Sequence, residues 1–128
     1  MDTNIRKPIL VAEDSTAMRG AIQGFLRQEG FTNIALAPDG VVAWNLLNKA
    51  EFDLVISDWM MPRMSGLDVL KNMRQSEFHE HIPFLMITIR DKADDILMAK
   101  KYGVSDYIIK PFTAKLLLEK VKMLLNLD

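Results

Sequence analysis

Short apolar runs alternate along the chain with longer stretches in which apolar residues recur every three or four positions. Short continuous apolar runs are typical of strands buried on both faces, whereas the longer spacing is typical of a helix with one apolar face. The expected strands occupy residues 9–12, 34–36, 54–56, 84–87 and 107–109. A helix is expected after each strand, beginning near residues 16, 40, 66, 92 and 114.

Polar residues and glycines mark where several of these helices begin and end. Ser15 or Thr16 can cap the first helix, and Thr113 can cap the last. Gly30 is expected to end the first helix. One face of the first helix is expected to turn inward, with Met18, Ala21, Ile22, Phe25 and Leu26.

Five strands that alternate with five helices predict an α/β fold with a parallel sheet covered by helices on both faces, a doubly wound architecture. Crossover connections in such sheets are right-handed. Ligands bind outside the carboxyl ends of the strands, at the point where the strand order reverses. The residues that follow each strand are therefore the candidates for chemistry.

Polar side chains follow four of the five expected strands. Glu13 and Asp14 follow the first strand, Asp58 the third, Thr88 the fourth and Lys110 the fifth. Because the carboxyl ends of parallel strands meet at one edge of a sheet, we expect these five side chains to lie close together.

Three carboxylates at one edge repel one another, and a single pair at ~4 Å costs about 4 kcal/mol at an effective dielectric near 20. The ammonium of Lys110 cannot balance all three. Mg²⁺ can, since it takes one or two carboxylates, keeps several waters and binds phosphate oxygens. Zn²⁺ is not expected, because the chain has no Cys and its two histidines, His79 and His81, are predicted to lie in a polar loop.

A carboxylate beside a metal can attack phosphorus and form an aspartyl phosphate. Asp58, nearest the centre of the sheet, is the best candidate for this nucleophile, with Lys110 and Thr88 stabilising the transferred group. Taken singly, Asp14 and Thr88 could be helix caps and Lys110 a solvated charge. Those simpler roles do not explain why all these strand ends suit phosphate and Mg²⁺ together.

Composition narrows the class of protein further. A chain of 128 residues fits one domain, and a formal charge of −1 gives no overall field that favours nucleic acid or an acidic membrane. The absence of Cys excludes a disulfide framework and a cysteine nucleophile. No apolar run approaches the roughly 20 residues that span a bilayer. We expect a cytoplasmic protein with no nucleic-acid or membrane partner.

The chain resembles the receiver domains of two-component response regulators, and most closely the stand-alone CheY-like chemotaxis type. The segments that carry the resemblance are residues 11–15, 58–66, 86–88 and 106–112. The resemblance implies a flavodoxin-like fold with strand order 2-1-3-4-5 and a receiver domain that spans residues 1–128; the same order is a known property of CheY itself.

The resemblance also implies a role for each matched residue. Asp58 corresponds to the phosphoacceptor and Lys110 to the cation that pairs with the phosphoryl group. Asp14 corresponds to a direct Mg²⁺ ligand, Glu13 to an acid that reaches the metal through water, and the backbone carbonyl of Met60 to a further ligand.

Two further residues correspond to the moving parts of a switch. Thr88 is implied to swing toward the phosphoryl group, and Tyr107 to move from exposed to buried as the switch is thrown. The Lys110-Pro111 peptide bond is implied to be cis.

The implied function is a signalling switch rather than an enzyme that acts on other substrates. A sensor histidine kinase would supply the phosphoryl group, which would shift the population of two loop arrangements. The surface formed by the helix near 92–102, the strand 107–109 and the last helix would then bind an output protein. We expect a monomer, and the flagellar motor switch or another chemotaxis component is the candidate partner.

Three residues near the candidate site depart from the motor-binding chemotaxis protein. Met60 stands where that protein has Asn, Ile89 where a small residue is usual, and Arg90 where it has Glu. We hypothesise that Met60 and Ile89 restrict water and lengthen the life of the phosphorylated form. The start of the following helix is also more acidic, which puts the flagellar motor in doubt as the partner.

Three other functions remain open at this point. The first is a Mg²⁺-dependent phosphatase that uses an aspartyl phosphate, although Met60 occupies the position where such enzymes often carry a second acid. The second is a flavin or nucleotide binder on the same fold, which Glu13 and Asp14 disfavour because they repel phosphate. The third is a receiver domain cut from a longer regulator that controls transcription or another output.

Overall fold

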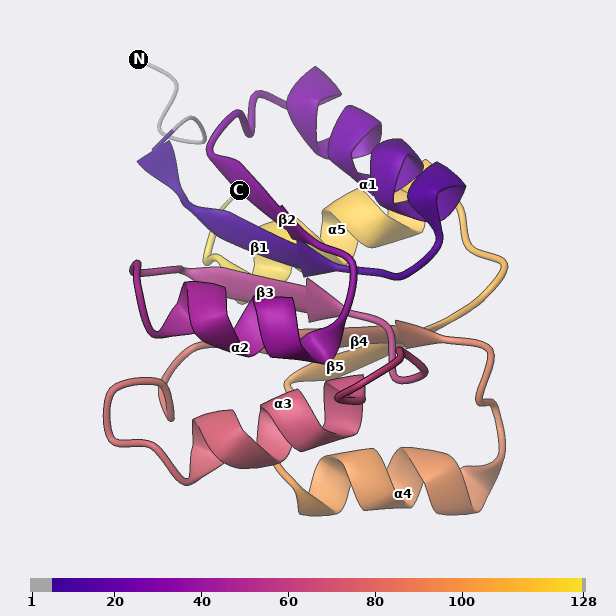
Figure 1. Ribbon diagram of the computed structural model, residues 1–128. Helices are drawn as coiled ribbons and strands as arrows, with labels where there is room; N and C mark the ends of the chain where they lie inside the picture. Colours follow the sequence, from indigo (N-terminus) through magenta and orange to yellow (C-terminus); the bar gives the residue numbers. More distant parts are fainter. Residues whose placement is uncertain (1–5, 128) are drawn as a thin grey trace.

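The computed structural model describes residues 6–127, which form five strands and five helices in strict alternation (Figure 1). The strands are β1 (Ile9–Ala12), β2 (Ile34–Ala37), β3 (Leu54–Ser57), β4 (Phe84–Thr88) and β5 (Asp106–Ile109). The helices are α1 (Thr16–Gln28), α2 (Gly40–Leu47), α3 (Gly66–Arg74), α4 (Ala93–Lys101) and α5 (Ala114–Leu124). The expected elements are confirmed, with small shifts at their ends.

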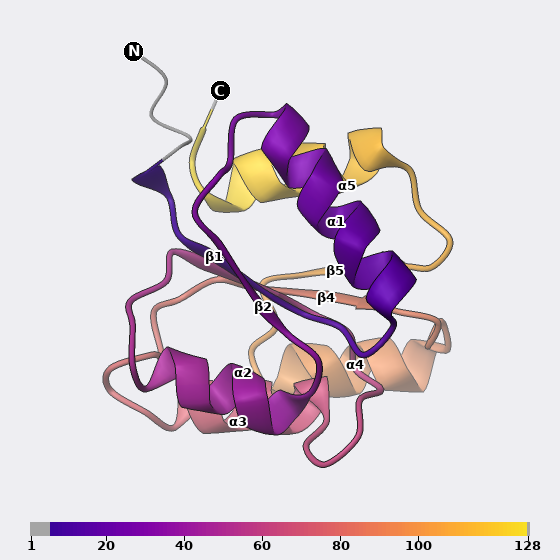
Figure 2. The same cartoon turned by 45° about the horizontal axis from the view of Figure 1, so that its top comes forward.

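All the strand pairs in the sheet are parallel, and the strand order is β2-β1-β3-β4-β5. Helices α1 and α5 cover one face, and α2, α3 and α4 cover the other (Figures 1 and 2). In the central pair Ala12 lies opposite Ser57, so β1 and β3 end level with each other at the same edge. The predicted doubly wound α/β fold is confirmed.

Side chains of the central strands divide between two cores, because successive residues of a strand point to opposite faces. In β1, Leu10 joins the core beneath α2, α3 and α4, whereas Ile9 and Val11 join the core beneath α1 and α5. Every residue of β1 and β3 is buried. Two buried faces explain why these strands are continuous apolar runs, and shortening Leu10 to Ala would cost roughly 2–5 kcal/mol.

Short polar side chains begin four of the helices. Ser15, Asp39, Ser65 and Thr113 each accept a hydrogen bond from the backbone N–H of the third residue that follows. Ser15 rather than Thr16 is therefore the cap of α1. Each such cap satisfies a backbone donor at the helix start, and replacing one with Ala typically costs about 1 kcal/mol.

Two backbone features agree with expectation. Gly30 has φ of 96°, in the left-handed region that favours glycine, and it lies just after the end of α1. The Lys110-Pro111 peptide bond is cis.

Two expectations were wrong in detail, and a third residue is more buried than its position suggested. Ala21 is exposed, since the buried face of α1 is centred on Ile22 and Leu26. Thr88 is the last residue of β4 and does not follow the strand. His79 lies in the loop between α3 and β4, as expected, but its side chain is buried, and its Nε2 is 2.8 Å from the Leu47 carbonyl oxygen.

Within residues 6–127, no helix combines the length and the apolar composition that crossing a membrane requires.

Candidate functional site

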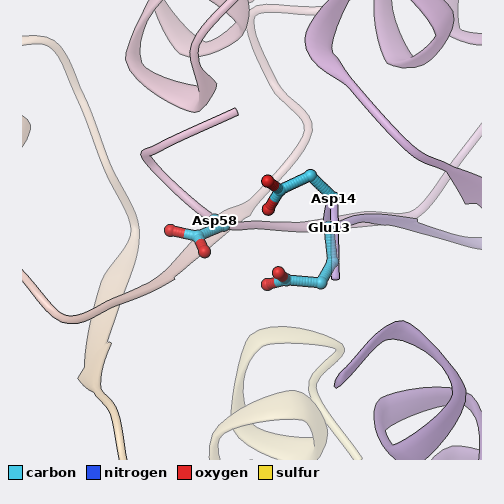
Figure 3. A group of neighbouring side chains, drawn as sticks. All are labelled: Glu13, Asp14 and Asp58. Atoms are coloured by element: carbon cyan, nitrogen blue, oxygen red, sulfur yellow. The ribbon is translucent and has the colours of Figure 1, made fainter. Parts of the chain in front are cut away.

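Three carboxylates meet at the carboxyl edge of the sheet (Figure 3). Oxygen atoms of Glu13, Asp14 and Asp58 all lie within 4.8 Å of one another. Glu13 and Asp14 follow β1, and Asp58 follows β3, so the level ends of these two strands place the three groups together. Glu13 and Asp58 are buried, and Asp14 is exposed to solvent.

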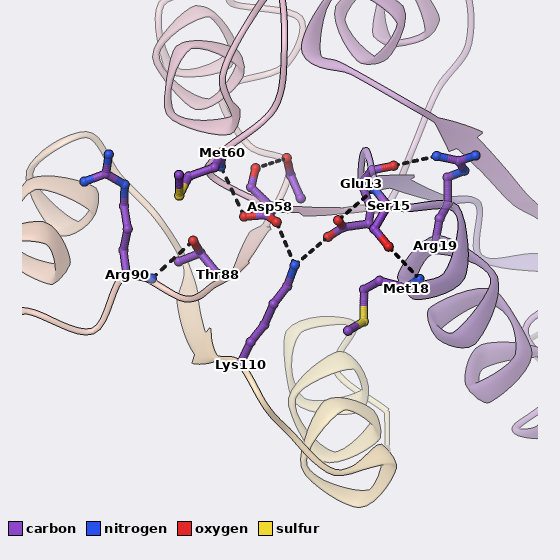
Figure 4. A network of polar contacts seen from close by, with 10 residues as sticks. Glu13, Ser15, Met18, Arg19, Asp58, Met60, Thr88, Arg90 and Lys110 are labelled. Carbon is purple, nitrogen blue, oxygen red and sulfur yellow. Dashed lines mark hydrogen bonds and ion pairs between the residues drawn. The ribbon is translucent and has the colours of Figure 1, made fainter.

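The ammonium of Lys110 joins two of these carboxylates (Figure 4). Its Nζ lies 2.7 Å from Asp58 Oδ2 and 3.0 Å from Glu13 Oε2. Lys110 follows β5 directly, and its long side chain spans the end of β4 to reach the centre of the sheet. One ammonium group thus pairs with two of the three carboxylates, so the cluster keeps a net negative charge.

Burial and charge shift the titration of this cluster. Burial raises the pKa of the Glu13 carboxyl, and the charge of Asp58 adds to the rise, while the hydrogen bond from Lys110 opposes it. Burial by itself would lower the pKa of the Lys110 ammonium, but its hydrogen bonds to Asp58 and Glu13 outweigh burial, so this pKa lies above its usual value. Lys110 therefore stays charged beside the two acids at neutral pH.

Backbone contacts hold the Asp58 side chain and main chain in place. The Met60 N–H donates to Asp58 Oδ1 at 3.1 Å, and the Ser57 hydroxyl donates to the Asp58 carbonyl at 2.8 Å. A Cβ at Gly66 would lie 1.9 Å from the same carbonyl oxygen, so only glycine allows α3 to start this close to Asp58. Asp58 Oδ1 is thus held by the Met60 N–H, and Oδ2 faces the Lys110 ammonium.

The two residues expected to act as a switch lie on neighbouring strands. Thr88 is fully buried, and its Oγ1 accepts a weak hydrogen bond from the Arg90 N–H at 3.4 Å. Tyr107 is half-buried, and its hydroxyl donates to the Arg90 carbonyl at 2.7 Å. Burial raises the pKa of Tyr107 to about 12, and the charge of Asp95 adds to the rise. Both residues therefore meet at the backbone of Arg90.

Sequence reasoning noted Arg90 only as a departure and missed what its side chain contacts. Arg90 Nη1 lies 3.2 Å from Asp95 Oδ1, and the guanidinium lies 4.8 Å from the centre of the Trp59 ring. Such stacking is worth about 0.5–1 kcal/mol where it is solvent-exposed. Arg90 thus ties the loop after β4 both to the residue next to Asp58 and to the first turn of α4.

A second missed residue is Arg19, which donates from Nη1 to the Glu13 carbonyl at 2.7 Å. The Ser15 N–H also donates to Glu13 Oε1 at 3.2 Å. Both contacts fix the turn from β1 into α1, which carries two of the three acids. The only sequence signal for Arg19 is its place in the first turns of a helix that starts beside the acidic pair.

The cluster fits a hard divalent cation. Its donors are carboxylate oxygens, which Mg²⁺ prefers, and the negative charge is only partly offset by Lys110. Asp14 leaves one side open to solvent, as an ion that keeps several waters requires. The structure therefore brings the predicted acids and Lys110 together at one edge of the sheet, and the individual roles of these residues stay predictions.

Comparison with known proteins agrees with this geometry. Residues 9–122 match the response regulator receiver domain family. Chemotaxis protein CheY-3 of Vibrio cholerae is 45% identical over 118 residues, which cover 92% of this chain and 91% of that protein.

Solved structures are similar over nearly the whole length. The chemotaxis response regulator CheY4 of Vibrio cholerae superposes with a TM-score of 0.86 at 29% identity, over 92% of this chain and 98% of that chain. The receiver domain of sensor histidine kinase PA1611 from Pseudomonas aeruginosa superposes with a TM-score of 0.86 at 23% identity, over 94% of this chain and 98% of that chain. That structure has a magnesium ion coordinated in its active site cleft. With the sequence match spanning β1 to α5, the chain belongs to the family of response regulator receiver domains.

Proposed function

We propose that this chain is a phosphorylation-activated signalling switch that accepts a phosphoryl group on Asp58 from a sensor histidine kinase. The observation that carries the proposal is the setting of Asp58. It directly follows the central strand β3, lies 2.7 Å from the Lys110 ammonium, and shares the sheet edge with Glu13 and Asp14.

In the transfer, an Asp58 carboxylate oxygen attacks phosphorus, and the bond from phosphorus to the donor's histidine nitrogen breaks. The electron pair of that bond stays on the nitrogen, and no proton is needed from Asp58 because it reacts as the carboxylate. The Lys110 ammonium lies against the acceptor carboxylate and stabilises the charge carried by the phosphoryl oxygens.

Asp14, Asp58 and the Met60 carbonyl would hold Mg²⁺ directly, and Glu13 through water. When bound, Mg²⁺ would supply positive charge to the phosphoryl oxygens. The Met60 N–H orients Asp58 Oδ1, and the burial of Asp58 limits its contact with water. The acidic cluster is the support for the metal, together with the magnesium ion found in the PA1611 receiver domain.

Phosphorylation would be read out through Thr88 and Tyr107. Both hydroxyls hydrogen-bond to the backbone of Arg90, so a movement of Thr88 toward a phosphoryl group would shift the acceptor of the Tyr107 hydroxyl. The neighbouring surface of α4, β5 and α5 exposes Leu97, Ile109 and Leu116. We propose that this face binds an output protein, and the similarity to a chemotaxis protein makes chemotaxis the favoured pathway.

Phosphotransfer from a labelled histidine kinase tests the proposal. Wild type should take up one phosphoryl group per chain in the presence of Mg²⁺ and little after chelation, and Asp58→Asn should take up none. Asp53→Asn is the matched control, because Asp53 is an exposed acid just before β3, at the opposite end of that strand. Uptake by Asp58→Asn equal to wild type would reject the proposal. Steady release of phosphate from small phosphate esters would favour the phosphatase.

A further inference from the structure

The segment between β3 and α3, residues 58–65, is anchored to the start of α2 by an ion pair distant in sequence. Arg63 Nη2 lies 2.9 Å from Asp39 Oδ2, and Arg63 Nε donates to the same oxygen at 3.1 Å. Both guanidinium nitrogens converge on one carboxylate oxygen. This geometry holds the middle of the segment at a defined point on the neighbouring helix.

Asp39 is itself held rigidly at this point. Its other oxygen, Oδ1, accepts from the Val42 N–H at 2.9 Å and caps α2. The Asp39 side chain is 11% exposed and the Arg63 side chain 59%. The backbone hydrogen bond from Val42, with the pairing to Arg63, lowers the pKa of Asp39, so the carboxylate is charged at neutral pH. Asp39 is thus the buried, fixed member of the pair, and Arg63 is the exposed member.

A second contact next to the first presses the segment against α2. A Cβ at Gly40 would lie 2.0 Å from the Met64 carbonyl oxygen, so a side chain there would displace the segment. Arg63 also has φ of 68°, a conformation that residues with a side chain rarely adopt. The local backbone preference opposes this turn, and the ion pair favours it.

The same turn carries Met60 toward the acidic cluster. The Gly66 N–H donates to the Trp59 carbonyl at 2.8 Å and closes the segment, so the position of Arg63 constrains the path of residues 59–66. Met60 lies within this closed turn, and its N–H holds Asp58 Oδ1. Fixing Arg63 therefore limits where the Met60 carbonyl can point.

We propose that Arg63 is a positioning residue of the metal site, because its ion pair with Asp39 holds the β3–α3 segment so that the Met60 carbonyl can bind a divalent cation. This inference rests on the proposed function, and in particular on Mg²⁺ binding beside Asp58. Exposed ion pairs contribute little to overall stability. The role of Arg63 is therefore to order the segment and not to stabilise the fold.

The test is calorimetric titration of the full chain with MgCl₂, without any phosphodonor, together with thermal unfolding in the absence of Mg²⁺. The variants are Arg63→Ala, Asp39→Asn and the double variant; Asn keeps the helix cap but loses the charge. We expect each single variant to bind Mg²⁺ about 10-fold more weakly, the lower end of the loss seen for outer-shell partners of a metal. The double variant should be no weaker than either single variant, and apo thermal stability should change little.

Three further variants separate the ion pair from other causes. Arg63→Lys should recover part of the affinity, because it keeps the charge. Arg63→Gly removes the backbone strain but also removes the charge, so we expect its affinity for Mg²⁺ to stay as weak as that of Arg63→Ala. Lys122→Ala breaks the ion pair of Lys122 with Glu29 between α5 and α1 and should bind Mg²⁺ like wild type.

The outcomes distinguish this inference from the proposed function. Wild-type affinity in Arg63→Ala and Asp39→Asn would overturn the inference and leave the phosphorylation switch intact. Wild-type affinity in Arg63→Gly would overturn it too, because backbone strain and not the ion pair would then be the cause. Absence of Mg²⁺ binding by the wild type would overturn both.

Discussion

At the level of single residues, one ammonium group stands between two buried acids. Lys110 Nζ contacts both Asp58 and Glu13, and the exposed Asp14 is the third member of the cluster. The acids are close enough to repel one another, so part of the folding free energy is spent on keeping them together. The effect of removing one charge should therefore have the opposite sign to that of most substitutions.

Asp14→Asn should raise the free energy of unfolding by about 1 kcal/mol without Mg²⁺, the order expected for one like-charge pair near the surface. It should also abolish most of the stabilisation that added Mg²⁺ gives the wild type, since binding to the folded state alone stabilises it. Urea unfolding with and without MgCl₂ measures both effects. Asp53→Asn is the control, and a loss of stability in Asp14→Asn would contradict the account.

Tyr107 should titrate late, with a pKa of about 12 in the folded chain against about 10 unfolded. A raised folded pKa means that its contribution to stability is complete below pH ~10 and is lost as pH rises toward ~12. The stability difference between wild type and Tyr107→Phe should therefore shrink over that window. Ultraviolet absorbance of the phenolate, compared between the two proteins, measures the titration. A full Tyr107 signal by pH ~10 would contradict the prediction.

Ile89 follows Thr88 directly and is 63% exposed. If its side chain restricts water at the phosphoryl group, Ile89→Ala should lose the phosphoryl group severalfold faster than wild type. Loss of label after the kinase is removed gives the rate. Ile109→Ala is the matched control, an exposed isoleucine on β5, and equal rates for Ile89→Ala and wild type would reject the hypothesis.

At the level of elements, helix α4 is held at both ends. The Arg90–Asp95 pair ties its first turn to the loop after β4. Beyond its last turn, Arg74 of α3 donates to the Gly103 carbonyl at 2.9 Å. Ala99 is the buried residue of α4, and the helix exposes Leu97 and Met98. A helix with so small a buried face depends on these terminal contacts for its position.

Arg74→Ala should lower the free energy of unfolding by about 2–3 kcal/mol. Arg74 donates to three carbonyls, those of Gly103, Glu80 and Ile82, and its removal leaves them to water or unpaired. Urea unfolding measures the loss. Arg27→Ala, an exposed arginine in the last turn of α1, is the control and should change stability by less than about 0.5 kcal/mol.

At the level of the whole molecule, the sheet separates two helical layers and gathers the chemistry at one edge. The proposed output face of α4, β5 and α5 adjoins that edge through Tyr107, whose hydroxyl donates to the backbone of the loop after β4. In the proposed switch, a change at Asp58 would therefore reach this face through one short loop. The opposite edge carries the exposed Phe78, in the loop between α3 and β4, which lies away from the proposed path.

Loading Asp58 with beryllofluoride, which mimics an aspartyl phosphate, should strengthen capture of the output protein by the immobilised chain. Ile109→Ser should weaken that capture, because it removes an apolar contact from the proposed face. Phe78→Ser is the control at the other edge of the sheet. Equal capture with and without beryllofluoride, or a larger effect of Phe78→Ser, would reject the proposed face.

The amino-acid sequence was enough to predict the elements, the α/β class and the edge where the acids and Lys110 meet. The elements follow from local signals, because runs of apolar residues mark buried strands and helical periodicity marks helices. The common edge follows because the carboxyl ends of parallel strands lie together. The strand order came from resemblance, because no local pattern states which strands pair. The caps at Ser15 and Thr113 were also readable, because a cap and its partner lie three residues apart.

Contacts between distant segments became visible only in the folded chain. The Arg63–Asp39 pair joins residues 24 positions apart. The buried ring of His79 hydrogen-bonds to the carbonyl of Leu47, 32 positions away. The stacking of Arg90 on Trp59 likewise depends on how two loops pack. A charged or polar residue in a loop has no periodic signal, so its partner is chosen by the packing of the elements on either side. The elements and the fold class were thus predictable from local patterns, whereas the strand order and the fine positioning of the site were not.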